Sequence, residues 1–301
     1  MKSSILIPQS SILEAAISAA TGTRLRIASS HHVSGGCIHT ALALEGEDGR
    51  RYFAKTNDAT HAENLAAEAD GLVALAAAGM CVPVVVTHGV ADGTAFLVLE
   101  YLALRDGAPG DYHELGRRLA RMHTTALGDR FGWDRANFIG ATPQHNNRSD
   151  DWIEFWDRER LAPQLALAAK RGFGGSLQSL GERLRRALPE LLAGRAPKPS
   201  LLHGDLWSGN ASFLESGEPV VFDPAVYYGD READLAMTEL FGGFPRSFYA
   251  GYGEVAPIDA GYPMRRDLYN LYHVLNHANL FGGGYPQQAV RKMERLLAAA
   301  G

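Results

Sequence analysis

Three oxygen-bearing side chains stand at spacings that suit the transfer of a phosphoryl group. Asp205 and Asn210 lie five positions apart in the run LLHGDLWSGN, and Asp223 ends the next strongly apolar run of the chain. A carboxylate can align a hydroxyl nucleophile, and two oxygen donors can hold Mg²⁺ against nucleotide phosphates. We therefore take Asp205 as the candidate catalytic group, and Asn210 and Asp223 as the candidate Mg²⁺ ligands.

Each of these residues also has a simpler structural interpretation. Gly and Asp are common in turns, so the His-Gly-Asp sequence at 203–205 could be a turn alone. Asn210 could be a turn residue beside a glycine, and Asp223 could be a strand-end cap before a proline. The functional interpretation is favoured because several elements recur in order. The kinase catalytic loop has the same Asp-to-Asn interval, and its metal-binding Asp follows on a nearby strand.

Two residues close to Asp205 in the sequence are weaker candidates for a role in the reaction or in substrate binding. We expect His203 to be a buried histidine that is hydrogen-bonded to nearby backbone, rather than a carrier of protons. Trp207 lies between Asp205 and Asn210. It could form a stacking wall for a substrate, or it could pack between parts of the protein, and the sequence leaves both open.

A loop and a lysine in the first hundred residues could bind nucleotide phosphates. Ser34, Gly35 and Gly36 lie between two strand-like runs, where backbone N–H groups could close on phosphate oxygens. A Gly-Gly pair is equally ordinary in a hairpin turn. Cys37 follows directly, and it is either an inert small residue or an oxidation-sensitive thiol. Lys55 ends the next strand-like run, where a kinase places the lysine that reaches the α- and β-phosphates.

A lysine at a strand end is usually just solvated. A functional role for Lys55 therefore requires an acidic side chain that pairs with it. The following helix offers Glu63 and Glu68. Glu63 fits a capping box that begins at Thr60, so we choose Glu68 as the partner of Lys55. Backbone groups of the segment Glu100-Tyr101-Leu102 would then face the edge of an adenine, a role that nearly any residues can fill.

The order of the predicted elements indicates an α+β protein with two lobes. Strand-like runs dominate residues 1–102, with one long helix at 61–78, and predict a mainly antiparallel nucleotide-binding lobe. Residues 103–301 are mainly helical and would form the catalytic and substrate-binding lobe. Further helices are expected at 11–21, from Asp111 onward, and at 151–171, 176–193, 231–240, 264–281 and 286–299.

Composition excludes several classes of partner. The chain has 301 residues, a net charge of −5 and no block of Lys or Arg, so we expect neither a nucleic acid nor a membrane as partner. Its two cysteines cannot build a disulfide framework, which favours the reducing cytoplasm. The N-terminus is unlike a signal peptide, and no apolar run is long enough to span a membrane.

Beyond these residues, the chain resembles the fructosamine kinase (ketosamine-3-kinase) family nearly end to end. This family belongs to the aminoglycoside-phosphotransferase-like branch of the protein-kinase-like fold. The most specific stretch is the run at 222–237. The motifs that carry the resemblance are SGGCI at 34–38, EADGL at 68–72, FIG at 138–140, PQ at 143–144, Asn146, the helix at 152–160, HGDLWSGN at 203–210, FDPAVYYGDREADLAM at 222–237, FGGFP at 241–245 and LYHVLNH at 271–277.

The resemblance implies a two-lobed kinase that uses ATP and Mg²⁺ to phosphorylate the sugar 3-hydroxyl of a ketoamine. The phosphorylated product is unstable and frees the amine, so the activity is one of deglycation. Motif for motif, Asp205 becomes the catalytic carboxylate, Asn210 and Asp223 the Mg²⁺ ligands, and Lys55 with Glu68 the phosphate-holding pair. Trp207 and His277 become candidates for contact with the substrate, which is either a small molecule or attached to a protein.

Some features separate this chain from its relatives. Asp223-Pro224-Ala225 replaces the Asp-Phe-Gly of protein kinases, and helical sequence follows almost at once, which leaves no room for a regulatory activation loop. His39 stands where the family often has Asn. We expect a monomer or a weak dimer. The alternatives are a kinase of aminoglycosides, choline or homoserine, and a nucleotide-binding module without catalysis.

Overall fold

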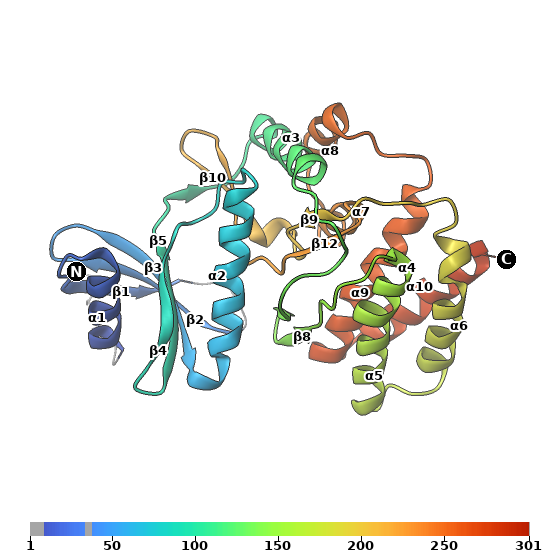
Figure 1. Cartoon of the computed structure of the whole chain (residues 1–301), viewed down its shortest axis with the longest axis horizontal. Coiled ribbons are helices and arrows are strands. Elements are labelled where there is room, and N and C mark those ends of the chain that lie inside the picture. Colours follow the sequence, from blue (N-terminus) through green and yellow to red (C-terminus); the bar gives the residue numbers. More distant parts are fainter. Residues whose placement is uncertain (1–8, 34–37, 301) are drawn as a thin grey trace. The chain divides into compact units, whose positions relative to one another are not determined.

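The computed structural model describes residues 9–33 and 38–300 and forms two compact units. The first unit comprises Met1–Asp106 together with Ser212–Asp223, and the second comprises Gly107–Ala211 together with Pro224–Gly301. The functional division at 102/103 stays a prediction. Figure 1 shows the elements of both units.

An antiparallel sheet of five strands forms the centre of the first unit, with the strand order β1-β2-β3-β5-β4. Its middle strand, β3, pairs with β2 on one side and with β5 on the other. The strands are β1 (Ile27–His32), β2 (Thr40–Gly46), β3 (Arg51–Asp58), β4 (Val85–Ala91) and β5 (Thr94–Glu100).

Two helices, α1 (Ser10–Thr21) and α2 (Ala62–Ala77), lie on opposite faces of this sheet (Figure 1). Side chains alternate along a strand, so each strand can serve both faces. Ala54 on β3 packs in the core cluster that includes Leu13 and Ile17 of α1. The next residue, Lys55, therefore faces α2. The alternation thus places one buried charged group on the α2 side of the central strand.

A smaller sheet brings residues of the second half of the chain back into the first unit. Its strand order is β11-β10-β6, and the strands are β6 (Leu104–Arg105), β10 (Ala211–Leu214) and β11 (Pro219–Val221). The N–H of Val221 donates to the carbonyl of Cys81 at 3.0 Å. This bond fixes the end of β11 close to the chain that follows α2, and Asp223 comes two residues later.

Helices dominate the second unit. Helices α5, α9, α10 and α6 lie together, and α3 pairs with α8 (Figure 1). The helices are α3 (Pro109–Thr125), α4 (Trp152–Phe155), a π-helix (Trp156–Leu161), α5 (Ala162–Lys170), α6 (Ser176–Leu191), α7 (Glu232–Thr238), α8 (Arg246–Val255), α9 (Tyr262–Phe281) and α10 (Tyr285–Ala300). The aromatic side chains of Trp152, Phe155 and Trp156 are part of the core of this unit, because each is at most 4% exposed.

Two short antiparallel strand pairs interrupt the helices of this unit. Strand β9 (Ser200–Leu202) pairs with β12 (Tyr227–Gly229), and β7 (Asn137–Ile139) pairs with β8 (Thr142–Gln144). The β9–β12 pair holds the segment after β9, which contains Asp205, next to the segment before β12.

Several helix boundaries differ from those expected. Asp111 does not begin α3. The helix begins at Pro109, and the Asp111 carboxylate accepts a hydrogen bond from the N–H of Ala108 at 2.8 Å. Thr60 does not cap the long helix of the first unit, because Asp58 caps a short 3₁₀ turn that precedes it. The helix expected at 151–171 contains the π-helical segment, and Pro163 lies in the first turn of α5.

Candidate active site

Lys55 is the centre of a three-residue cluster in the first unit. Its ammonium group donates a hydrogen bond to Oε1 of Glu68 on α2 at 2.7 Å. It also forms an ion pair with the carboxylate of Asp223, which follows β11. The pairing of Lys55 with Glu68 and the nearby Asp223 are therefore present in the structure. Their role with a nucleotide remains a proposal.

Burial and neighbouring charges together set the pKa values of Lys55 and Glu68. Lys55 is 8% exposed. Burial acts to lower the pKa of Lys55, but the charges of Glu68 and Asp223 outweigh it and raise that pKa, so the lysine stays cationic. Burial raises the pKa of Glu68 to about 7 against the opposing charge of Lys55, and the charge of Asp223 adds to the rise. Lys55 thus stays cationic and faces two carboxyl groups, of which Glu68 is the more deeply buried.

Asp223 has an unusual backbone conformation. Its φ is 57°, in the left-handed region that few side chains other than Asn and Asp adopt, and Pro224 follows it. Its side chain is 39% exposed, whereas that of Glu68 is 11% exposed. A carboxylate oxygen is a ligand that Mg²⁺ prefers, so Asp223 fits the predicted metal role by its chemistry and by its access to solvent.

The other nucleotide-binding candidates of the first unit are placed in part. Glu100 ends β5, and its N–H donates to the carbonyl of Val84 at 2.8 Å. Tyr101 and Leu102 follow it, and the guanidinium of Arg51 lies 3.7 Å from the centre of the Tyr101 ring. Ser34, Gly35, Gly36 and Cys37 lie outside the described residues.

In the second unit, the segment after β9 is held by a close backbone approach. The N–H of Ala225 donates to the carbonyl of His203 at 2.8 Å. Gly204 has φ of 83°, and a Cβ at this position would lie 2.0 Å from the carbonyl oxygen of Ala225. Only glycine fits here. The Gly of the His-Gly-Asp sequence thus allows the chain before Asp205 to turn against its neighbour.

Asp234 holds the same segment from the other side. Its Oδ2 accepts a hydrogen bond from the N–H of His203 at 2.7 Å, and its Oδ1 accepts one from the N–H of Gly204 at 2.8 Å. Nε2 of His123 lies 3.1 Å from Oδ2. Burial acts to raise the pKa of Asp234, but the hydrogen bond from His123, its charge and the backbone N–H groups outweigh it and lower that pKa. A buried, ionised carboxylate therefore anchors the loop that carries Asp205.

Asp205 and Asn210 lie next to each other. Nδ2 of Asn210 donates to the carbonyl of Asp205 at 2.9 Å and to its carboxylate Oδ2 at 3.4 Å. Of the two amide atoms, only Oδ1 has lone pairs that could ligate a cation. The N–H of Asp205 donates to Nδ1 of His203 at 3.3 Å. His203 is thus a buried histidine bonded to nearby backbone, as expected from the sequence.

Trp207 and His277 lie in one group of aromatic rings in the second unit. Trp207 is 37% exposed, and its ring lies 6.4 Å from that of Phe241. The rings of Phe241 and His277 are 4.6 Å apart. The structure therefore links both predicted substrate contacts through a third aromatic residue.

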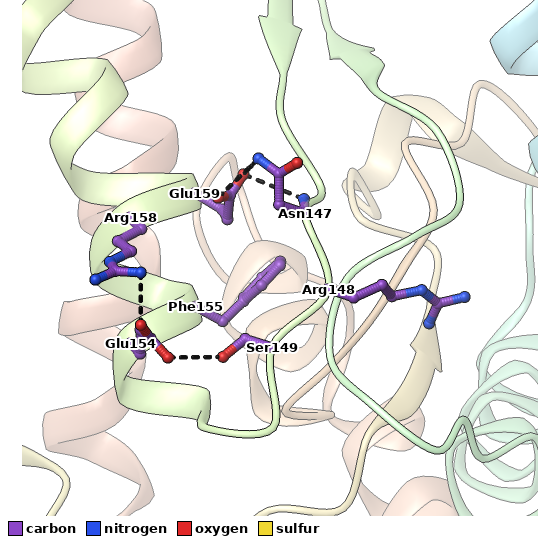
Figure 2. A pocket seen from close by; sticks show the side chains of 7 residues that line it. All are labelled: Asn147, Arg148, Ser149, Glu154, Phe155, Arg158 and Glu159. Carbon is purple, nitrogen blue, oxygen red and sulfur yellow. Dashed lines mark hydrogen bonds and ion pairs between the residues drawn. The ribbon is translucent and has the colours of Figure 1, made fainter.

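A small hollow elsewhere in the second unit is a poor candidate for the active site. It has a volume of about 90 Å³ and lies beside α4 and the π-helix. Figure 2 shows that most of its polar side chains bond to one another: Asn147 to Glu159, and Ser149 and Arg158 to Glu154, while Arg148 points away from them. Ligand pockets usually measure ~300 to 1,000 Å³, so the hollow is too small for a nucleotide or a sugar.

Residues 9–33 and 38–300, the part of the chain that the structure describes, lack two features. They contain no group of three or more His, Cys, Asp or Glu side chains placed to hold a metal ion. None of their helices combines the length and the apolar character that crossing a membrane requires.

The comparisons with known proteins decide the family. The model of the family described as fructosamine kinase matches residues 10–299. The chain belongs to the fructosamine kinase family. This membership confirms the family predicted from the sequence and, with it, the α+β protein-kinase-like fold and the class of enzyme, a phosphotransferase.

Individual members of the family agree with this result. The chain is 47% identical over 283 residues to a Synechocystis sp. protein named as a probable ketoamine kinase, with 93% of this chain and 94% of the relative covered. It is 40% identical over 272 residues to a chloroplastic protein-ribulosamine 3-kinase of Oryza sativa subsp. japonica, with 89% and 79% covered. A crystal structure of a protein assigned as a fructosamine-3-kinase from Haemophilus somnus has a TM-score of 0.87 at 27% identity, with 95% and 96% covered.

Two residues that hold the loop before Asp205 were not singled out from the sequence. Asp234 lies within the long motif at 222–237, but no role was predicted for it, and His123 was not considered. One signal was available. Asp234 stands between Ala233 and Leu235 in a short apolar helix, where a carboxylate must be buried and therefore needs partners.

Proposed function

We propose that this chain is an ATP-dependent kinase that phosphorylates the 3-hydroxyl of the sugar part of a ketoamine. The main support for this proposal is a group of polar side chains in each of the two units. The first holds an ammonium group between two carboxylates, and the second holds the bonded pair of Asp205 and Asn210. The similarity to ketoamine and ribulosamine kinases over nearly the whole chain supports the choice of acceptor.

Asp205 would align the nucleophile. Its carboxylate accepts a hydrogen bond from the sugar 3-hydroxyl and points the oxygen at the γ-phosphorus of ATP. As the new O–P bond forms, the bond from the γ-phosphorus to the bridging oxygen breaks and ADP leaves. The hydroxyl proton passes to Asp205 and then to solvent. Phosphoryl transfer needs positioning more than a strong base, so a carboxylate suffices.

Lys55 would hold the α- and β-phosphates. Glu68 keeps its ammonium group in place, because the two are bonded at 2.7 Å. Oδ1 of Asn210 and the carboxylate of Asp223 would hold Mg²⁺, which supplies charge neutralisation at the phosphates when bound. Ser34, Gly35 and Gly36 would supply backbone N–H groups to the phosphates, and the segment Glu100-Tyr101-Leu102 would meet the adenine.

We place the enzyme in the cytoplasm, acting as a monomer or weak dimer. The support is the composition, since the two cysteines cannot form a disulfide framework and no basic block suits a nucleic acid or an anionic membrane.

Phosphorus NMR tests the proposed function. The chain is mixed with Mg²⁺ and ATP, with and without a ribulosamine or a fructosamine. We expect ATP to be consumed with the ketoamine, and a new phosphate ester resonance coupled to the proton on carbon 3 of the sugar. Turnover of choline, homoserine or an aminoglycoside but of neither ketoamine would overturn the acceptor. ATP binding without turnover of any acceptor would instead indicate a module without catalysis.

A further inference from the structure

Five aromatic side chains form a continuous row that begins two residues after Asp205. We call this set, Trp207, Phe241, His277, Phe281 and Tyr285, the aromatic row. From Trp207 it runs through Phe241 to His277, with ring centres 6.4 and 4.6 Å apart. His277 then contacts the ring of Phe281 at 5.4 Å and that of Tyr285 at 5.1 Å.

The two ends of the row are open to solvent. Trp207 is 37% exposed and Phe281 is 58% exposed. Phe281 is the last residue of α9, and Tyr285 is the first residue of α10. The glycines between the two helices carry no side chain that could cover the rings. The row is therefore a surface that a flat or apolar group could contact.

The middle of the row carries one hydrogen-bond acceptor. Nδ1 of His277 lies 2.8 Å from the carbonyl oxygen of His273. Since a carbonyl can only accept, Nδ1 must donate, and Nε2 of the neutral ring is left as an acceptor. Burial lowers the pKa of His277, so the ring stays neutral at physiological pH. Neutral ring faces with an acceptor between them suit a group that is cationic and donates an N–H.

We propose that the aromatic row binds the amine side of the ketoamine, namely its ammonium nitrogen and the substituent on that nitrogen. Ring faces attract a single ammonium group, and the exposed ring of Phe281 together with the half-buried ring of Tyr285 suits an apolar or aromatic substituent. The row contains no carboxylate. An acceptor with many ammonium groups would need carboxylates, so the row favours one cation with an apolar substituent.

This inference rests on the proposed function, because only that function supplies the amine. In a ketoamine, three carbons separate the 3-hydroxyl oxygen from the amine nitrogen. A sugar held at Asp205 would therefore bring its nitrogen to the beginning of the row at Trp207. The substituent would continue towards His277 and Phe281. The sugar 3-hydroxyl and the amine would thus be recognised by adjacent parts of the second unit.

The test uses two ketoamines that share ribulose and differ only in the amine, benzylamine in one and methylamine in the other. Calorimetry gives the Kd of each, and initial rates give kcat and KM. We expect the benzylamine adduct to bind about tenfold more tightly, because one apolar contact discriminates by roughly that factor. The difference should appear in KM rather than in kcat.

Variants locate the preference on the row. Phe281→Ala and Tyr285→Ala should each reduce the ratio of the two Kd values several-fold. Phe281 is largely exposed, so its truncation should leave the fold intact. Leu127→Ala is the matched control, because Leu127 is an apolar residue of the same unit, 40% exposed and outside the row. It should leave the ratio unchanged.

The possible outcomes distinguish the role of the aromatic row from the proposed kinase function. Equal Kd values for both ketoamines, absence of binding, or an unchanged ratio in both row variants would overturn the role of the aromatic row. Binding that prefers the benzylamine adduct without turnover of either compound would support the row and defeat the proposed function.

Discussion

The carboxylate of Asp234 accepts a hydrogen bond from the backbone N–H of His203 at 2.7 Å. This bond and its companion to the N–H of Gly204 tie helix α7 to the loop that carries Asp205. Asp234 can affect turnover without contacting the substrate. It fixes the backbone from which the Asp205 side chain extends, so it acts as a positioning residue.

Replacing Asp234 should therefore impair turnover. In Asp234→Asn, an NH₂ group takes the place of one acceptor oxygen and leaves a buried N–H of the loop without its partner. Such a loss costs ~1 to 3 kcal/mol. We expect kcat to fall at least about tenfold, with the affinity for ATP little changed. Steady-state kinetics and calorimetry with ATP measure both quantities.

Glu232→Gln is the control for this variant. Glu232 is also a buried carboxylate of α7, but it bonds to Arg265 and not to the loop. It should lower thermal stability without a matching loss of kcat. Equal losses of kcat in the two variants would mean that Asp234 acts only through stability.

The stabilising effect of Asp234 should depend on pH in one direction. Its pKa lies below the ordinary value of 3.8 in the folded protein. The ionised form is thus favoured by folding, and its contribution to the free energy of unfolding is complete above that value and lost as the pH falls through the folded pKa. Urea unfolding should show a constant difference between wild type and Asp234→Asn from pH 8 to 5, and a smaller one below pH 4. A difference that grows on acidification would contradict the assignment.

Gly204 and Gly172 offer a matched pair of glycine substitutions. Both have φ near 85°, at 83° and 86°, but a Cβ would meet the carbonyl oxygen of Ala225 at 2.0 Å only at Gly204. Gly172→Ala should cost ~1 to 2 kcal/mol for the left-handed conformation alone. Gly204→Ala should cost several kcal/mol and abolish turnover, because the loop must shift. Thermal unfolding and kcat of both variants test this, and equal losses of stability would refute the close approach.

Lys55→Met removes the cation between two carboxylates. We expect kcat/KM for ATP to fall about 100-fold or more, the loss typical of one charged group that stabilises a transition state. Lys292→Met is the control, because Lys292 is also a buried lysine, paired with Asp267 at 2.7 Å. It should lower stability and leave the kinetics with ATP unchanged. Similar kinetic losses in both variants would argue against the phosphate role of Lys55.

The sequence predicted the first unit well, because its signals are local. Alternation along β3 and the helix that follows place Lys55 and Glu68 within reach of each other, and these elements were recognised. The reason given for choosing Glu68 was nevertheless wrong in part, since Thr60 does not cap the long helix. The right partner followed from the geometry of strand and helix, not from the cap.

The second unit shows what sequence reasoning missed. Helix α8 was not predicted, because Gly251 and Gly253 lower its helix propensity. A Cβ on Gly251 would lie 2.0 Å from the carbonyl of His113, and one on Gly116 would lie 2.0 Å from that of Phe248. The glycine that weakens the local signal thus allows α3 and α8 to pack closely. Asp234 was missed similarly, because its partners are backbone N–H groups that carry no sequence signature.

The most direct test of the account is the turnover of Asp205→Asn, measured with a ketoamine beside the Kd for ATP. Asn keeps the size of the side chain but cannot accept the hydroxyl proton. We expect kcat to fall by roughly three orders of magnitude or more, while the Kd for ATP and the melting temperature stay close to those of the wild type. A kcat within about tenfold of the wild type would contradict the role of Asp205 and, with it, the proposed mechanism.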